Sequence, residues 1–172
     1  KGIGMYKKAE ELADANGWFF ARQFENEANA DIHESTTGNE ILADFRNQSL
    51  DYFVTGYGTG GTVSGVARVL RKERPKIKII LSEPENAALI GSGVSQSRSS
   101  DGSPSETHLA WEPHLTQGWT PDFIPEVLDP SVIDKLVTVK DEEAIQVARD
   151  LAVHEGIFCG ISCGATMAGA LK

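Results

Sequence analysis

Two short glycine-rich segments contain the residues whose types and spacing best suit the binding of a small anion. The first segment is Gly58-Thr59-Gly60-Gly61-Thr62. Glycines let a backbone turn so that several N–H groups point at one spot, and a following helix adds the positive end of its dipole. The hydroxyl groups of Thr59 and Thr62 are further donors. The segment predicts a cradle for a phosphate group, although a tight turn that binds nothing would use the same residues.

The first segment differs from the common nucleotide-binding motifs. No lysine follows the glycines, so it is not the nucleotide P-loop, and its spacing misses the dinucleotide fingerprint GxGxxG. The phosphate that it predicts therefore belongs to another kind of ligand.

The second segment is Gly160-Ile161-Ser162-Cys163-Gly164-Ala165. It offers the hydroxyl group of Ser162 at the expected start of a helix. Serine at such a position is most often an N-cap, which is the alternative to a ligand contact. The four histidines, His33, His108, His114 and His154, are scattered, and we expect structural or solvated roles for them.

Alternating strands and helices are expected to position these two segments. Helices are predicted from apolar periodicity and stop signals at 5–16, 32–45, 63–74, 141–155 and 162–172. Strands are predicted at 18–22, 51–55, 77–81, 136–139 and 157–158. This alternation predicts an α/β fold with a parallel sheet flanked by helices. Residues 91–119 show no periodicity, so we expect a long irregular segment there.

The composition restricts the partners. The 172 residues suit one domain, or one domain with part of another, and the net charge of −9 disfavours nucleic acid and anionic membranes as partners. There is no long apolar run of the kind that spans a membrane. Cys159 and Cys163 are expected to be small, buried and reduced, since their spacing fits no metal or redox motif. We expect a cytoplasmic protein, or an organellar one if a targeting segment lay upstream.

Taken together, the two segments resemble the cofactor motifs of cysteine synthase (O-acetylserine sulfhydrylase), an enzyme that uses pyridoxal 5′-phosphate (PLP). The stretches that carry the resemblance are Phe53–Thr62, Glu155–Ala165, and Gln23–Asn26 followed by Ile32-His33 and Thr36-Thr37-Gly38. It extends over nearly the whole chain. It implies the tryptophan synthase β-like fold (fold type II), in which a three-layer parallel sheet is flanked by helices.

The resemblance also implies roles for individual residues. Gly58, Thr59, Gly60, Gly61 and Thr62 match the loop that holds the PLP phosphate. Ser162 matches the serine that bonds the pyridine nitrogen. Gln23 matches a glutamine that contacts the carboxylate of the amino-acid substrate, although a surface glutamine is the alternative reading. Gly118 lies in a segment that lines the substrate site.

The activity implied is replacement of the acetate group of O-acetylserine by sulfide, which gives cysteine. Residues 1–23 would be the last helix and strand of a small N-terminal domain, and residues 24–172 most of the large PLP-phosphate-binding domain. The Schiff-base lysine would lie upstream, so we expect the isolated chain to be inactive. The resemblance further implies a homodimer, with serine acetyltransferase as a partner.

One segment departs from the cysteine synthase pattern and leaves two alternatives open. Where many of these enzymes have Gln-Gly-Ile-Gly-Ala-Gly-Phe, this chain has Gln117-Gly118-Trp119-Thr120-Pro121-Asp122-Phe123. Residues 122–125 and 127–129 look more like cystathionine β-synthase, which joins serine to homocysteine. The alternative of another class is a phosphate-binding α/β module without catalytic activity.

Overall fold

A parallel sheet of three strands forms the centre of the fold. The computed structural model describes residues 2–100 and 102–172. The sheet order is β1 (Tyr52–Thr55), β2 (Lys78–Pro84) and β3 (Lys135–Val139), and both strand pairs are parallel. In the register, Thr55 is paired with Leu81, and Leu81 with Leu136. The predicted parallel sheet is therefore confirmed, and all three carboxyl ends lie at the same edge.

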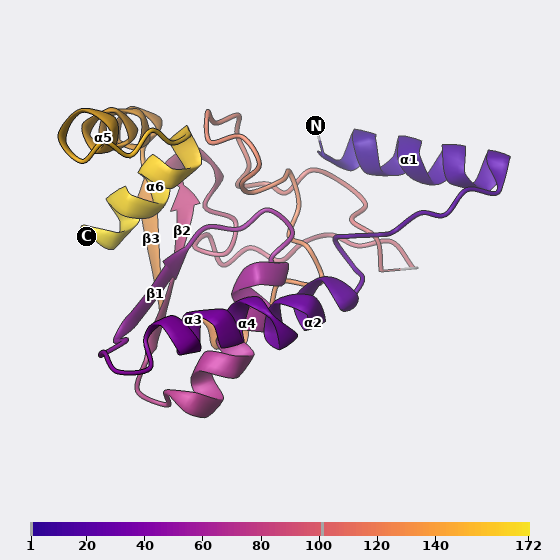
Figure 1. Cartoon of the computed structure of the whole chain (residues 1–172). Coiled ribbons are helices and arrows are strands. Elements are labelled where there is room, and N and C mark those ends of the chain that lie inside the picture. The colour runs from indigo at the N-terminus through magenta and orange to yellow at the C-terminus, as the bar shows by residue number, and fades with distance from the viewer. Residues whose placement is uncertain (1, 101) are drawn as a thin grey trace.

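Helices cover both faces of this sheet, as Figure 1 shows. On one side lie α2 (Ala28–Ser35), α3 (Thr37–Asp44) and α4 (Gly61–Glu73), and on the other α5 (Asp141–His154) and α6 (Ile161–Ala170). Helix α1 (Gly2–Asn16) lies apart from the sheet. The three-layer α/β architecture is confirmed. None of the helices within the described ranges is long and apolar enough to cross a membrane.

The core lies between β2 and α4. Val63, Val66 and Leu70 of α4 are at most 1% exposed, and they belong to one apolar cluster with Ile79 and Leu81 of β2. These residues recur at the helical and strand periods, so one stripe of the helix meets one face of the strand. The opposite face of β2 meets α6, where a Cβ atom on Gly169 would lie 2.1 Å from the hydroxyl oxygen of Ser82.

The helix predicted over 32–45 is two helices, because the chain breaks at Thr36. Both the backbone N–H and the hydroxyl group of Thr36 donate to the carbonyl oxygen of Ile32. A side chain that competes for a backbone acceptor in this way favours the end of a helix over its interior. The break turns α3 so that Gly38 packs against Val69 of α4, with 3.0 Å between a Cβ built on Gly38 and the Val69 side chain.

Two predicted strands are absent from the described residues. Segments 18–22 and 157–158 are irregular, with Phe19 90% exposed and Phe158 96% exposed. Apolar residues of the right type predict a strand, but a strand forms only where a neighbour supplies hydrogen bonds, and none does here. The expectation of two buried cysteines is wrong as well, because Cys163 is exposed.

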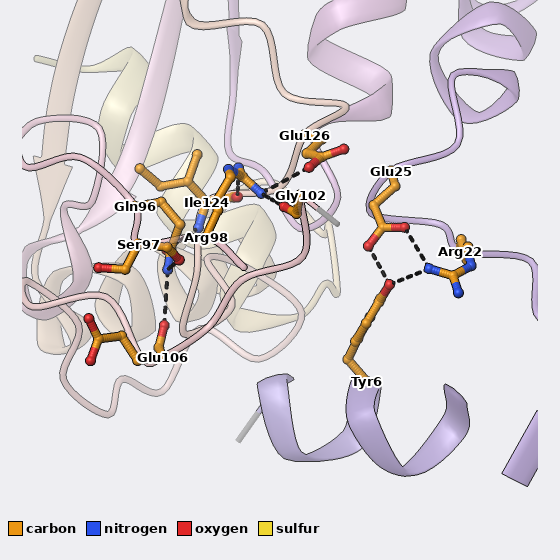
Figure 2. A network of polar contacts seen from close by, with 10 residues as sticks. All are labelled: Tyr6, Arg22, Glu25, Gln96, Ser97, Arg98, Gly102, Glu106, Ile124 and Glu126. Atoms are coloured by element: carbon orange, nitrogen blue, oxygen red, sulfur yellow. Dashed lines mark hydrogen bonds and ion pairs between the residues drawn. The ribbon is translucent and has the colours of Figure 1, made fainter. Parts of the chain in front are cut away.

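The buried face of α1 also differs from the predicted one. Met5 and Leu12 are exposed, whereas Ile3 and Tyr6 are buried. The Tyr6 ring packs against Phe20. Its hydroxyl group donates to the carboxylate of Glu25 and accepts from Arg22, as Figure 2 shows. A polar anchor therefore sets the rotation of this helix, which apolar spacing alone does not reveal.

In the predicted irregular segment, the described residues 91–100 and 102–119 contain no helix and no strand apart from a single bridge between Arg98 and Pro104. Side chains hold it in place. The guanidinium of Arg98 donates to the carbonyl oxygens of Gly102 and Ile124 and pairs with Glu126 (Figure 2).

Two glycines in helices give a matched test of this packing. A Cβ atom on Gly65 would lie 2.1 Å from the carbonyl oxygen of Ala30, whereas one on Gly4 would meet nothing within 4 Å. We expect Gly65→Ala to lower the free energy of unfolding by about 1–3 kcal/mol, as overpacking does. Gly4→Ala should leave it unchanged or raise it by up to about 1 kcal/mol. Urea unfolding measures both, and equal midpoints for the two variants would contradict the contact between α2 and α4.

Candidate functional site

The loop that follows β1 ends at the amino terminus of α4, and it presents free backbone donors. Gly60 is the N-cap of α4, in the left-handed region with φ of 88°. Within the described residues, the backbone N–H groups of Thr62 and Val63 have no acceptor. Two unpaired N–H groups and the helix dipole point the same way, which is the arrangement that binds anions. The structure therefore supports an anion site at the predicted place.

Neighbouring segments press against the backbone of this loop and leave no space for side chains. Cβ atoms would lie 2.2 Å from the ring of Trp119 at Gly56, 2.5 Å from the Gly118 carbonyl oxygen at Gly58, and 2.6 Å from Leu128 at Gly60. The loop therefore needs glycine at these three positions for close contact, and at Gly60 also for its left-handed conformation. Gly118, predicted to line the substrate site, lies directly against Gly58.

Asn29 joins Gln23 to the loop. Its side-chain nitrogen donates to the carbonyl oxygen of Gln23 at 2.8 Å and to the hydroxyl oxygen of Thr59 at 2.9 Å. Gln23 itself is exposed, so its side chain is free to reach a ligand. No sequence motif predicts this role for Asn29, and its place in the polar turn after Gln23 is the signal that could have pointed to it.

A histidine orients the last residue of the segment. The Nε2 atom of His33 lies 3.1 Å from the Thr62 hydroxyl oxygen, and its Nδ1 atom lies 2.9 Å from the hydroxyl oxygen of Thr37. The imidazole is therefore held from both sides by hydroxyl groups. Its position agrees with the structural role expected for it, and it ties α2 and α3 to the start of α4.

Ser162 occupies the second position of α6, because the N-cap is Gly160. The N-cap alternative for this serine is therefore wrong. Its side chain is half-buried, and its hydroxyl group makes no hydrogen bond within residues 2–100 and 102–172. A hydroxyl group left free at the start of a helix is able to meet a ligand.

Trp119 links the start of α6 to the glycine loop. Trp119 and Ile161 both pack against the same apolar cluster, which contains Val139 and Ala165. The indole ring also lies against Gly56, because a Cβ atom built on this glycine would be 2.2 Å from the ring. The structure thus places both glycine-rich segments around one tryptophan, which the sequence analysis treated only as a departure from the family pattern.

The buried carboxylate of Glu83, in β2, anchors the loop. The hydroxyl group of Tyr57 donates to Glu83 at 3.0 Å, and the N–H groups of Ile90 and Gly91 donate to the same carboxylate at 2.9 Å. Burial raises the pKa of Glu83 and also the pKa of Tyr57, and the Glu83 charge raises the latter further. Both side chains are buried, so we assign a structural role to the Tyr57–Glu83 pair.

Comparisons with known proteins agree with this geometry. The family model described as "Pyridoxal-phosphate dependent enzyme" matches residues 4–172. The chain is 49% identical over 164 residues to O-ureido-L-serine synthase of Streptomyces lavendulae, covering 95% of this chain and 46% of that protein. It is 40% identical over 169 residues to the cysteine synthase of Staphylococcus aureus strain Mu50, covering 98% of this chain and 49% of that protein.

A solved structure shows the same similarity in three dimensions. A crystal structure of O-ureido-L-serine synthase superimposes with a TM-score of 0.85 at 48% sequence identity, covering 98% of this chain and 48% of that chain. The chain thus spans about half the length of the relatives it matches.

Asn29 and Asn39 give a matched test of the anion site, because each side-chain amide donates two hydrogen bonds. We expect Asn29→Ala to weaken the binding of inorganic phosphate and of PLP about tenfold, since the hydrogen bond to Thr59 of the loop and the one to Gln23 are both lost. Asn39 lies in α3 and its side chain donates to carbonyl oxygens of α2, so Asn39→Ala should change neither affinity. Titration followed by calorimetry and by PLP absorbance measures both, and equal affinities in the two variants would exclude Asn29 from the site.

Proposed function

Since the chain belongs to the family of pyridoxal-phosphate-dependent enzymes, we propose that it is part of an enzyme that replaces the β substituent of O-acetylserine. Two relatives support this reaction class. Cysteine and O-ureido-L-serine, the products that their names state, share one amino-acid skeleton and differ only in the group on the β carbon. The observation that carries the proposal is the anion-binding loop at the start of α4, because PLP is anchored through its phosphate.

The residues present fit this cofactor. The cradle at 58–62 has unpaired N–H donors for a phosphate, and the free hydroxyl group of Ser162 suits the pyridine nitrogen. When bound, PLP supplies the electron sink that allows the α proton and the β substituent to leave. A neutral hydroxyl partner does not keep the ring nitrogen protonated, so the sink is weaker than with an aspartate and favours β-elimination over deeper carbanion chemistry.

The remaining residues of this chain bind and orient the amino acid. Gln23 contacts the substrate carboxylate, and Asn29 holds its backbone beside the loop. Gly118 lines the substrate site, and its positive φ of 87° is a backbone conformation that favours glycine. We propose that the lysine that binds PLP lies outside these residues, with 1–23 completing a small domain and 24–172 forming most of the large one.

Two second substrates are candidates. Sulfide would make the enzyme a cysteine synthase, which the 40% identity to such enzymes supports. The 49% identity to O-ureido-L-serine synthase favours a nucleophile that leaves a ureido group on the serine oxygen, which is hydroxyurea. We further propose a cytoplasmic homodimer that binds serine acetyltransferase, on the basis of the family resemblance.

The proposed reaction is tested with the complete polypeptide, PLP and O-acetylserine, with sulfide or hydroxyurea as the second substrate. We expect amino-acid product and acetate in equal amounts. Ser162→Ala should lower the PLP affinity about three- to tenfold, because one hydrogen bond to the ring is lost. Ser35→Ala, an exposed serine on α2, serves as the control. If no acetate is released with either nucleophile, the proposed function is wrong.

The place of the lysine has its own test on the 172-residue chain. We expect treatment with PLP and borohydride to label surface lysines at random and to give no turnover, because none of the chain's lysines is proposed to bind the cofactor. Peptide mass spectrometry maps the adducts. Labelling of a single lysine together with turnover would show that this chain carries the catalytic amine.

A further inference from the structure

Arg22, the residue before Gln23, has an unusual backbone conformation. Its φ is 49°, which lies in the left-handed region. Glycine reaches this region at no steric cost, whereas a residue with a β carbon is strained there. A strained residue persists only where the surrounding structure holds it, and such residues cluster at functional sites. The side chain of Arg22 makes the contacts that hold it.

The guanidinium of Arg22 donates hydrogen bonds to three different side chains. Its acceptors are the hydroxyl group of Tyr6 at 2.9 Å, the carboxylate of Glu25 at 3.2 Å and the carboxylate of Glu10 at 2.6 Å. The Tyr6 hydroxyl group donates to Glu25 in turn, which closes a ring of contacts (Figure 2). The guanidinium also lies 5.3 Å from the centre of the Phe20 ring, within the range of a cation–π contact. Arg22 is therefore fixed by a network of charge-assisted hydrogen bonds.

This network is more than one exposed ion pair. A single pair on the surface contributes little, because water and salt screen it. Here the side chain of Glu25 is only 18% exposed and that of Glu10 28% exposed. Burial raises the pKa of Tyr6, and the hydrogen bond to Glu25 raises it further, so the hydroxyl group keeps its proton and remains a donor. The network therefore has the same charges and donors throughout the neutral pH range.

The carbonyl oxygen of Arg22 begins the turn that follows. It accepts from the N–H groups of Glu25 and Asn26, both at 2.9 Å. The side-chain amide of Asn26 donates to the carbonyl oxygen of Ala21 at 3.2 Å. A negative φ at Arg22 would swing the chain that follows and separate these partners. The conformation of Arg22 therefore sets the direction in which the chain enters Gln23.

Gln23 lies between this network and the glycine loop. Its carbonyl oxygen accepts from Asn29, whose side chain also donates to Thr59 of the loop. The next carbonyl oxygen, that of Phe24, accepts from the N–H group of Val127 at 3.1 Å. The side chain of Gln23, in contrast, is exposed and makes no hydrogen bond in the described part of the chain. The backbone of Gln23 is thus held on both sides, and its amide group is left for a ligand.

We propose that Arg22 is a positioning residue for the amino-acid substrate, and that it holds the backbone so that the amide group of Gln23 meets the substrate carboxylate. The inference rests on the β-replacement reaction and on the role of Gln23 proposed above. Arg22 does not bind the carboxylate itself. The carboxylates of Glu10 and Glu25 already surround its single positive charge, so a third carboxylate would be repelled.

Arginine suits this position better than glycine does, although glycine would relieve the strain. Tyr6 and Glu10 lie on α1, whereas Glu25 lies in the turn after Gln23. The planar guanidinium presents several donors in a rigid fork, so one side chain reaches both the helix and the turn. Glycine would adopt the positive φ and make none of these contacts.

The test is a double-mutant cycle in the complete polypeptide with PLP and with O-acetylserine as the varied substrate. We expect Gln23→Ala to raise KM for O-acetylserine about tenfold, because a hydrogen bond to a charged group is lost, and Arg22→Ala to raise it about three- to tenfold. In both variants kcat should change little, since the carboxylate is bound equally in the ground and transition states. The double variant should have the KM of Gln23→Ala alone, because Arg22 acts through Gln23.

Arg71→Ala is the matched control. The guanidinium of Arg71 also donates to three groups, the carbonyl oxygens of Ile77 and Val132 and the carboxylate of Asp134. It lies in the last turns of α4, in ordinary helical conformation. This variant loses a comparable network, and its KM for O-acetylserine should equal that of the wild type.

The possible outcomes separate this inference from the reaction itself. Arg22→Gly takes the place of Arg22→Ala in the cycle if the alanine variant does not fold, because glycine adopts the positive φ without strain. An unchanged KM in either single variant, or additive effects in the double variant, overturns the inference while the wild-type enzyme still releases acetate. A wild-type enzyme that releases no acetate refutes the reaction, and the inference with it.

Discussion

The close approach of three segments to the backbone of residues 56–60 is the constraint on which the rest of the site depends. Trp119, Gly118 and Leu128 each occupy space that a side chain on the loop would need. The three glycines of the loop therefore have no room for a side chain, and the N–H groups at the start of α4 remain available. A side chain at any of these glycines would push the loop away from these segments, and the loop would then lose the shape that converges donors on one anion.

This constraint is met because the loop is held from several directions. Tyr57 anchors it inward to Glu83 and, through its carbonyl oxygen, outward to Thr120. Asn29 holds it from the side of α2. Each contact alone is a single hydrogen bond of modest net value, but together they leave the loop few alternative conformations. The bound ligand then needs to order little of the chain, which favours its affinity.

The segment around Trp119 borders both the glycine loop and a neighbouring cavity. The same residues that press on Gly56 and Gly58 continue into the wall of the neighbouring cavity. A larger residue in this segment would therefore change both the space in the cavity and the contacts that hold the loop. The names of two relatives, a cysteine synthase and an O-ureido-L-serine synthase, state products that differ in the group on the β carbon.

The sequence by itself determined the α/β class, three strands that it placed at 51–55, 77–81 and 136–139, the apolar stripe of α4 and the glycine-rich segment at 58–62, because these follow from local periodicity and from what glycine permits. It could not give the break at Thr36, the buried face of α1 or the irregular segments at 18–22 and 157–158, since these depend on polar anchors and on strand neighbours. Only the tertiary structure brought Asn29 and Trp119 to the glycine loop. Their roles depend on contacts between residues distant in the chain, and no local pattern records such contacts.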